Sequence, residues 1–277
     1  MTINKEQIRY NAYFNLPEIV EGIGSIYPII VPKYKRFSEL FSKYMLYSVS
    51  GLKNIGKLDK SIDLNLFNFI TISCLQTENL ELKLQSDIKH SNGEDFESVN
   101  EKLYALDMYG FKTKELEELI EMILNKDIVY DDVDNEFMVK GSIYGEKINE
   151  ENFEIFRDIV MTQNVIYEPF TVKSKLAQKE LEKEFKNRQK DSQSTDFLSM
   201  IVVVDMNSNG DVNSYSYYKL LACYEIINKK ILGDYIQRLM AQGVKEKLVN
   251  LGDELNINDN PYSKEKLFKK HTVDTSL

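Results

Sequence analysis

The residues with the clearest potential for chemistry lie between Asp205 and Val212. Oxygen-bearing side chains occupy alternate positions there and a glycine follows them, in the order Asp205, Asn207, Asn209, Gly210, Asp211 and Val212. A calcium loop has this pattern, because its alternate oxygens point toward the ion and its glycine permits a sharp bend. The spacing therefore makes Asp205, Asn207, Asn209 and Asp211 candidate calcium ligands.

The twelfth position of this loop departs from the known patterns. An EF-hand supplies a bidentate glutamate there, whereas this chain has Ser216. Residues 212–214 also resemble a dockerin-type loop, which requires an aspartate at that place and occurs as a paired repeat that this sequence lacks. We favour a polar connection between two helices, in which the Asn-Gly pair at 209–210 supplies a positive φ and Asp211 or Asn213 caps the next helix.

The sequence offers few groups for catalysis. Its two histidines, His90 and His271, fall in a predicted polar loop and a predicted tail, where no rigid element would hold a general base or a metal ligand. A metal-dependent nuclease site could use four charged residues of a predicted hairpin: Asp131, Asp132, Glu136 and Lys140. The lysine follows the glutamate by four positions instead of two, and charges commonly protect a hairpin edge from aggregation. We therefore predict a protein without catalytic residues.

Composition narrows the classes of partner. The 277 residues carry a net charge of −9, which disfavours non-specific nucleic-acid binding. Residues 76–155 hold 21 acidic and 8 basic side chains, so the acidic charge is concentrated there. No apolar run is long enough to cross a membrane, and the N-terminus lacks the pattern of a signal peptide. The two cysteines, Cys74 and Cys223, resemble small core residues and suit a reducing cytoplasm.

Hydrophobic periodicity predicts an α+β fold that is mainly helical. Residues 1–15 look polar and mobile, and residues 26–32 look like an extended edge segment. Alternating leucines predict a short strand over residues 79–84, and residues 127–144 look like a β-hairpin. Helices are expected over residues 34–47, 61–75, 96–106, 113–124 (with Thr113 as its N-cap), 152–162 and 174–191. Pro169 marks a candidate boundary, which divides the chain into a mixed α+β unit (1–168), a helical region (169–243) and a polar, mobile tail (244–277).

The elements that flank the candidate calcium loop are a short apolar helix and a long amphipathic one. From Asn213 onward, apolar residues recur at steps of three and four and define one side of a helix of about six turns. That side packs either against the rest of the chain or against another copy. The residues on it that we expect to contact a partner are Tyr217, Leu221, Tyr224, Ile231 and Tyr235.

Three blocks of sequence together resemble a family of phage proteins. They are YFNLPEIVEGIGSIYPI at 13–29, FRDIVMTQNVIYEPF at 156–170 and NSYSYYKLLACYEIIN at 213–228. They are similar to tail-morphogenesis proteins of phages of low-GC Gram-positive bacteria, encoded near the tape-measure gene and often described as tail assembly chaperones. The DMNSNGDV loop at 205–212 is a departure from that family.

The resemblance implies a non-catalytic protein of the host-cell cytoplasm that binds other tail components and chaperones the tape-measure protein. A first alternative is a permanent tail or baseplate subunit of the virion, packed against neighbouring copies. A second is a calcium-responsive protein-binding module. Each reading predicts an apolar helical surface that meets another protein, with no nucleic-acid and no membrane partner.

Overall fold

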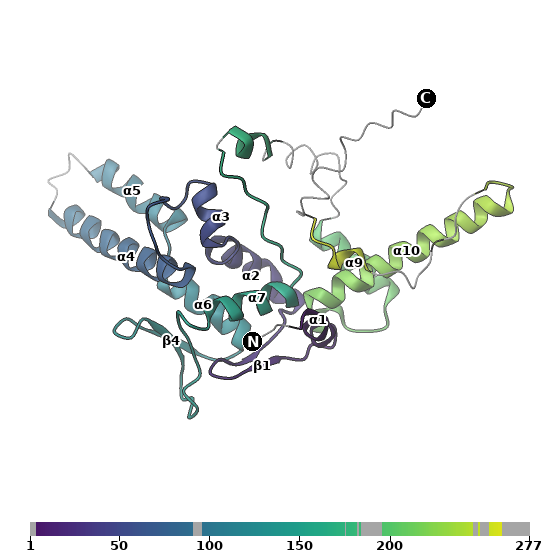
Figure 1. Ribbon diagram of the computed structural model, residues 1–277, viewed down its shortest axis with the longest axis horizontal. Helices are drawn as coiled ribbons and strands as arrows, with labels where there is room; N and C mark the ends of the chain where they lie inside the picture. Colours follow the sequence, from purple (N-terminus) through teal and green to yellow (C-terminus); the bar gives the residue numbers. More distant parts are fainter. Residues whose placement is uncertain are drawn as a thin grey trace.

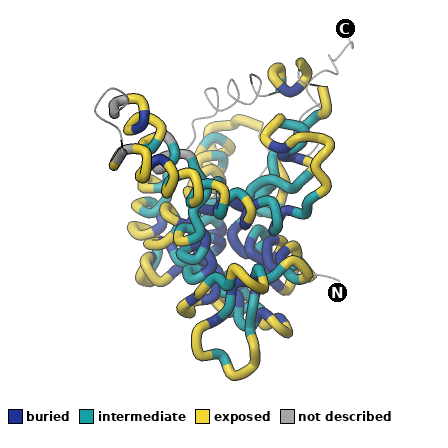
Figure 2. Tube along the Cα trace, turned by 90° about the vertical axis from the view of Figure 1, so that its left-hand side faces the viewer, coloured by how far each residue is buried: buried dark blue, intermediate teal, exposed yellow. Residues whose placement is uncertain are grey.

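The computed structural model describes residues 4–90, 96–174, 176–181, 183, 196–245, 249 and 255–261. The fold is α+β and mainly helical, as the sequence predicts. Figure 1 shows an elongated molecule in which the α4–α5 pair projects at one end and α10 at the other. Figure 2 shows the buried residues gathered in the middle of the molecule.

Two small antiparallel sheets accompany the helices. The first pairs β1 (Glu18–Val20) with β2 (Gly24–Ile26), and the second has the order β3 (Ile128–Asp131), β4 (Glu136–Val139), β5 (Lys147–Ile148). The helices are α1 (Lys5–Tyr13), α2 (Val31–Tyr44), α3 (Val49–Asn54), α4 (Leu66–His90), α5 (Phe96–Tyr109), α6 (Thr113–Leu124), α7 (Phe153–Gln163), α9 (Phe197–Asn207) and α10 (Tyr217–Ala241), with short 3₁₀ turns η1 (Val212–Ser214) and η2 (Asn256–Asn258).

The main core forms where α2, α6, α7 and the three-stranded sheet meet. Leu116, Leu119, Ile120 and Ile123 recur at helical spacing on α6, and each is almost fully buried. The helix covers the predicted residues, but its N-cap is Lys112 and not Thr113. The Thr113 backbone N–H is instead satisfied by the Glu78 carboxylate, 3.2 Å away on α4.

The predicted β-hairpin at 127–144 is confirmed and gains a third strand. Tyr130 pairs with Phe137 in the β3–β4 register, and Phe137 pairs on its other side with Ile148 of β5. Phe137 and Ile148 are buried against the helical core. The two-residue strand β5 was not predicted, because so short a segment carries no alternation that a sequence could reveal.

The predicted strand over residues 79–84 is wrong, because these residues lie in the middle of α4. Leu80, Leu82 and Leu84 alternate as in a strand, but only Leu84 is buried. No glycine or proline interrupts residues 66–90, so nothing ends the helix at the predicted position near Leu75. Helix α4 therefore continues through this stretch to His90.

The prediction of a polar, mobile N-terminus is also wrong for residues 5–13, which form α1. Asn4 caps this helix by accepting a hydrogen bond from the Gln7 backbone N–H. Ile8 and Ala12 lie one turn apart and are both buried, on α7 and α10 respectively. Ile8 and Ala12 are the buried residues of α1. Two apolar residues in an otherwise polar segment give too weak a periodicity to predict a helix.

Helices α9 and α10 pack directly onto the N-terminal part of the chain. Ile30 and Ser216 form an isolated antiparallel bridge, in which the Val31 N–H donates to the Tyr215 carbonyl and the Tyr217 N–H donates to the Ile29 carbonyl. The Tyr34 and Tyr217 rings stack with centroids 3.4 Å apart. Val31 belongs to the same hydrophobic cluster as residues of α9 and α10. The boundary predicted at Pro169 therefore separates regions that share a hydrophobic cluster.

Part of the predicted tail returns to this junction. The Tyr167 hydroxyl donates to the Ile257 carbonyl, and the Arg9 guanidinium donates to the Asn258 carbonyl. Leu255 and Ile257 pack against Tyr218 and Ala222 of α10. The residues after 261 lie outside the part of the chain that the structure describes.

Candidate functional site

The predicted calcium ligands do not converge in this conformation. Asp205 and Asn207 belong to α9, where residues two positions apart point to nearly opposite sides. The Asn207 amide donates to the Val203 carbonyl of its own helix. Asn209 and Asp211 lie in the exposed turn that follows. Calcium binding here stays a prediction, and calorimetric titration of the Asp205→Ala variant beside the wild type tests it.

The same turn is organised by caps. Asp211 accepts a hydrogen bond from the Asn213 N–H at 3.0 Å and opens η1, while Ser216 caps α10 by accepting one from the Lys219 N–H at 3.1 Å. The long helix consequently begins at Tyr217 and not at Asn213. The predicted positive φ at 209–210 is wrong, because neither residue has one. Gly210 is needed for another reason, since a Cβ there would lie 3.2 Å from two ring carbons of Tyr215.

The structure places both cysteines and Glu136, a carboxylate of the candidate nuclease site. Cys74 is buried, and burial raises the pKa of its thiol to about 12; burial also raises the pKa of the Cys223 thiol. Glu136 forms an ion pair with Lys147 at 2.7 Å. Within the described residues, no three His, Cys, Asp or Glu side chains are grouped closely enough to hold a metal ion. The side chains of His90 and His271 lie outside the described part of the chain.

Helix α10 divides into a covered half and an uncovered half. Its first half packs against α9, with Leu220 fully buried and Tyr217, Tyr224 and Ile227 half-buried in the same cluster. Leu221 is half-buried as well. Helix α9 has 11 residues and α10 has 25, lengths of roughly 16 and 37 Å. The shorter helix cannot cover the longer one, so part of the apolar side of α10 is exposed after Ile227, whereas Ile236 and Leu239 remain half-buried.

The uncovered half carries a set of exposed apolar side chains that we call the arm surface. Figure 1 shows this half of α10 extending away from the body of the molecule. Ile231 and Tyr235, two of the five predicted contact residues, are each 58% exposed. The arm surface consists of Ile231, Leu232, Tyr235 and Met240 on α10 and of Val244 just after the helix. Of the other three predicted residues, Tyr217 and Tyr224 pack in the cluster with α9, and Leu221 is half-buried.

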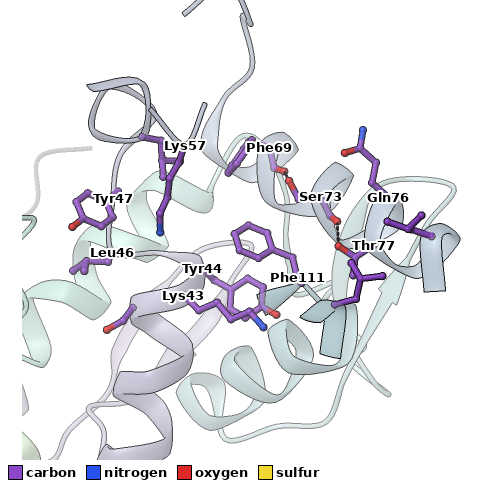
Figure 3. Close-up of a pocket in the computed structure, with 15 residues that line it drawn as sticks. Lys43, Tyr44, Leu46, Tyr47, Lys57, Phe69, Ser73, Gln76, Thr77 and Phe111 are labelled. Carbon is purple, nitrogen blue, oxygen red and sulfur yellow. Dashed lines mark hydrogen bonds between the residues drawn. The ribbon is translucent and has the colours of Figure 1, made fainter. Parts of the chain in front are cut away.

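The second candidate surface is a groove at the other end of the molecule, between α2, α3 and α4 (Figure 3). This groove has a volume of about 490 Å³ and mixes aromatic, aliphatic and polar walls, with Lys57, Phe69 and Phe111 around one space. It continues along α4 and α5 past Leu80 and Leu106. We did not predict this groove from the sequence. Leu80 of α4 forms part of its wall, and the prediction had assigned residues 79–84 to a strand.

Glu115 joins the helices beneath this groove. It accepts hydrogen bonds from the Lys43 ammonium at 2.6 Å and from the Tyr44 hydroxyl at 2.7 Å, and the same hydroxyl accepts one from the Lys112 backbone N–H. Burial raises the pKa of the Glu115 carboxyl, but these two hydrogen bonds outweigh burial, so its pKa lies below the ordinary 4.5.

We expect Glu115→Gln to remove an acid-sensitive contribution to stability. A carboxyl whose pKa is lowered on folding stabilises the protein above its unfolded pKa, and that contribution disappears as the pH falls through the folded value. The variant should lose on the order of 1–2 kcal/mol at pH 7, and its difference from the wild type should shrink below pH 4.5. Urea unfolding between pH 3 and 7 measures both, with Glu118→Gln, on the exposed Arg36 pair, as the control.

Comparisons of the chain with protein-family models, with curated proteins and with solved structures found no match. Among the described residues, no helix combines the length and the apolar character that a membrane span requires. The arm surface and the groove are thus the two surfaces from which a function has to be argued.

Proposed function

We propose that this chain is a non-catalytic binding protein that acts in the assembly of phage tails. Its arm surface would hold an apolar helical segment of another tail component, and the tape-measure protein is the first candidate. The observation that carries the proposal is the exposure of Ile231 and Tyr235, each 58%, on a helix that extends from the body. Exposed apolar side chains in a contiguous row commonly mark a protein-binding site.

The form of the arm surface favours a helical partner. Ile231 and Tyr235 lie four residues apart and so form a row along α10, which the half-buried Leu239 continues. A helix with its own apolar stripe can lie along such a row and exclude water from both. Holding that segment would keep a long helical protein from aggregating before it is incorporated.

The three blocks that carry the family resemblance support the proposal in a different way, because they contact one another. The Gln163 amide of the second block donates to the Ile26 carbonyl of the first at 3.0 Å. The Ile29 N–H donates to the Asn164 side chain at 3.1 Å, and the Ile29 carbonyl accepts from Tyr217 in the third block. The resemblance therefore concerns the residues that hold the first half of α10 in place. The arm surface follows directly after them on the same helix.

Co-expression with a tape-measure protein tests the proposal. We expect the tape-measure protein to shift from the insoluble to the soluble fraction when this chain is present and to copurify with it. The control is co-expression of the full chain with Ile231 and Tyr235 both replaced by glutamine. An unchanged soluble fraction, in repeated trials with the tape-measure protein of the same phage, would contradict the chaperone role.

A permanent virion subunit is the second candidate, and one observation favours it. The β1–β2 hairpin exposes Ile19, which is 78% accessible to solvent, so this edge could pack against a neighbouring copy. Light scattering at high salt separates the two candidates: a stable ring or large multimer supports the virion subunit, and a monomer or small oligomer supports the chaperone.

A further inference from the structure

A cleft lined with lysines lies next to α3, at a distance from the arm surface. It has a volume of about 670 Å³ and is formed by the end of α3, the loop after it and residues 173–179. Four lysines contribute to its walls: Lys53, Lys60, Lys173 and Lys179. We call it the lysine cleft.

The charge of the lysine cleft is only partly balanced by the described residues. The hydrogen bonds from Ser61 and, to a smaller extent, the charge of Lys53 lower the pKa of the Asp59 carboxyl. None of its four ammonium groups forms an ion pair with a carboxylate in the described ranges. Asp59 is the one acidic residue in the wall, and its carboxylate accepts hydrogen bonds from the Ser61 hydroxyl and N–H. In a chain with a net charge of −9, a concave surface with this excess of positive charge can receive an anionic group.

A matching anionic projection stands at the tip of the β3–β4 hairpin. This acidic tip consists of Asp131, Asp132, Val133 and Asp134, and Val133 is 86% exposed. The Asp131 carboxylate accepts hydrogen bonds from the Val133 N–H at 2.9 Å and the Asp134 N–H at 3.3 Å. These bonds hold the turn in one shape, so little conformational entropy would be lost on binding.

The base of the acidic tip is fixed as well. The Asn135 amide donates to the Asn68 side chain at 2.9 Å, and the Tyr130 hydroxyl donates to Asn135 at 2.8 Å. The tip is therefore a short, rigid projection with three carboxylates, attached to α4 and to the sheet.

The acidic tip and the lysine cleft lie on opposite sides of the molecule. Figure 1 shows α3 in the upper part of the molecule and β4 in the lower part. A chain cannot place its own tip in its own cleft. We propose that the acidic tip of one copy docks in the lysine cleft of a second copy.

This contact is heterologous, because it joins two different surfaces of the same chain. A pair joined by one such contact keeps one tip and one cleft unused, so association continues head to tail into a ring or an open row. The contact area is small and the charges are exposed, so the association is weak and strongly dependent on salt. It is separate from the arm surface, which stays available to another protein.

Nucleic acid is the competing occupant of a lysine cleft, and the observations favour the acidic tip. Binding a phosphate backbone gains from counterion release over many contacts, whereas this cleft offers four lysines on an acidic protein. The complementary surface, by contrast, is present on the chain itself and has the right sign and a fixed shape.

Charge reversal tests the proposal by sedimentation velocity over a range of protein concentrations. The cleft variant is Lys53→Glu with Lys60→Glu, the tip variant is Asp132→Lys with Asp134→Lys, and the control is Lys33→Glu with Lys35→Glu on exposed positions of α2. We expect the wild type and the control to associate at low salt and to dissociate at high salt. Each of the other two variants should associate more than about tenfold more weakly.

Mixing the two variants is the decisive step. The cleft variant has an acidic cleft and an acidic tip, and the tip variant has a basic cleft and a basic tip, so each repels itself and attracts the other. An equimolar mixture should regain the association of the wild type. The proposal is overturned if the mixture stays dissociated, if the wild type is monomeric at low salt, or if the cleft lysines prove necessary only for binding a single-stranded oligonucleotide.

Discussion

Replacing Arg157 by methionine is expected to lower the free energy of unfolding by about 3–5 kcal/mol. Arg157 is 4% exposed and donates to the Met45 carbonyl at 2.6 Å, the Leu46 carbonyl at 3.0 Å and the Glu168 carboxylate at 3.2 Å. Methionine fills a similar volume but leaves two carbonyls and a carboxylate without their donor. Each such loss costs the desolvation of a polar group.

The effect should extend beyond α7, because Glu168 also fixes the start of α3. Its carboxylate accepts hydrogen bonds from the Ser48 N–H at 2.8 Å and the Ser48 hydroxyl at 2.7 Å. Arg157 therefore connects α2, α3 and α7 through two carbonyls and one carboxylate. Urea unfolding of the variant should show the loss as a lower midpoint with the slope unchanged.

Arg36→Met is the matched control for this prediction. Arg36 makes a two-pronged contact with Glu118, at 2.8 and 2.6 Å, but its side chain is 46% exposed. A solvent-exposed pair contributes at most about 1 kcal/mol. Similar losses in the two variants would show that burial is not what gives Arg157 its importance. Arg157→Lys should fall between them, because lysine keeps the charge and loses the planar fork.

Replacing Ile231 and Tyr235 together by glutamine should weaken partner binding at least about 100-fold. Both side chains are 58% exposed in the isolated chain, so they contribute little to its own core, and glutamine is a good helix former. The free energy of unfolding should change by less than about 0.5 kcal/mol. Titration calorimetry with a soluble tape-measure fragment measures the affinity, and chemical unfolding measures the stability.

The control for the arm variant is Ile143→Gln with Tyr144→Gln. These two residues are 85% and 84% exposed in the connection between β4 and β5, so the control removes the same two side-chain types from a different surface. Binding should be unchanged in the control. Equal loss of affinity in both variants would indicate that general surface hydrophobicity, and not the arm, attracts the partner.

The parts of the fold that could be predicted are those with a strong local period. Leu116, Leu119, Ile120 and Ile123 define α6 without reference to the rest of the chain, and the hairpin around Asp134-Asn135 has alternation on both sides of a turn. The full length of α4 was not predicted, because three alternating leucines in it have the spacing of a strand. Helix α1 was missed because its burial depends on α7 and α10, which are distant in sequence.

The candidate site could be predicted only in part, for a related reason. Periodicity identified the apolar side of α10, but it could not show that α9 covers Tyr217 and Tyr224 and leaves Ile231 and Tyr235 exposed. The spacing of Asp205 and Asn207 suggested a calcium loop, but both residues lie in α9. The sequence alone does not show whether such a segment folds around an ion or continues as a helix. The groove and the lysine cleft depend on contacts between distant elements.

Site-specific photocrosslinking tests the binding role of the arm surface most directly. A photoreactive phenylalanine analogue in place of Tyr235 is activated in cells that also produce the tape-measure protein, and the same analogue in place of Tyr144 serves as the reference. We predict a covalent product with the tape-measure protein from position 235 and none from position 144. Crosslinks of equal yield at the two positions, or no product at 235 beside a demonstrated complex, would contradict the account.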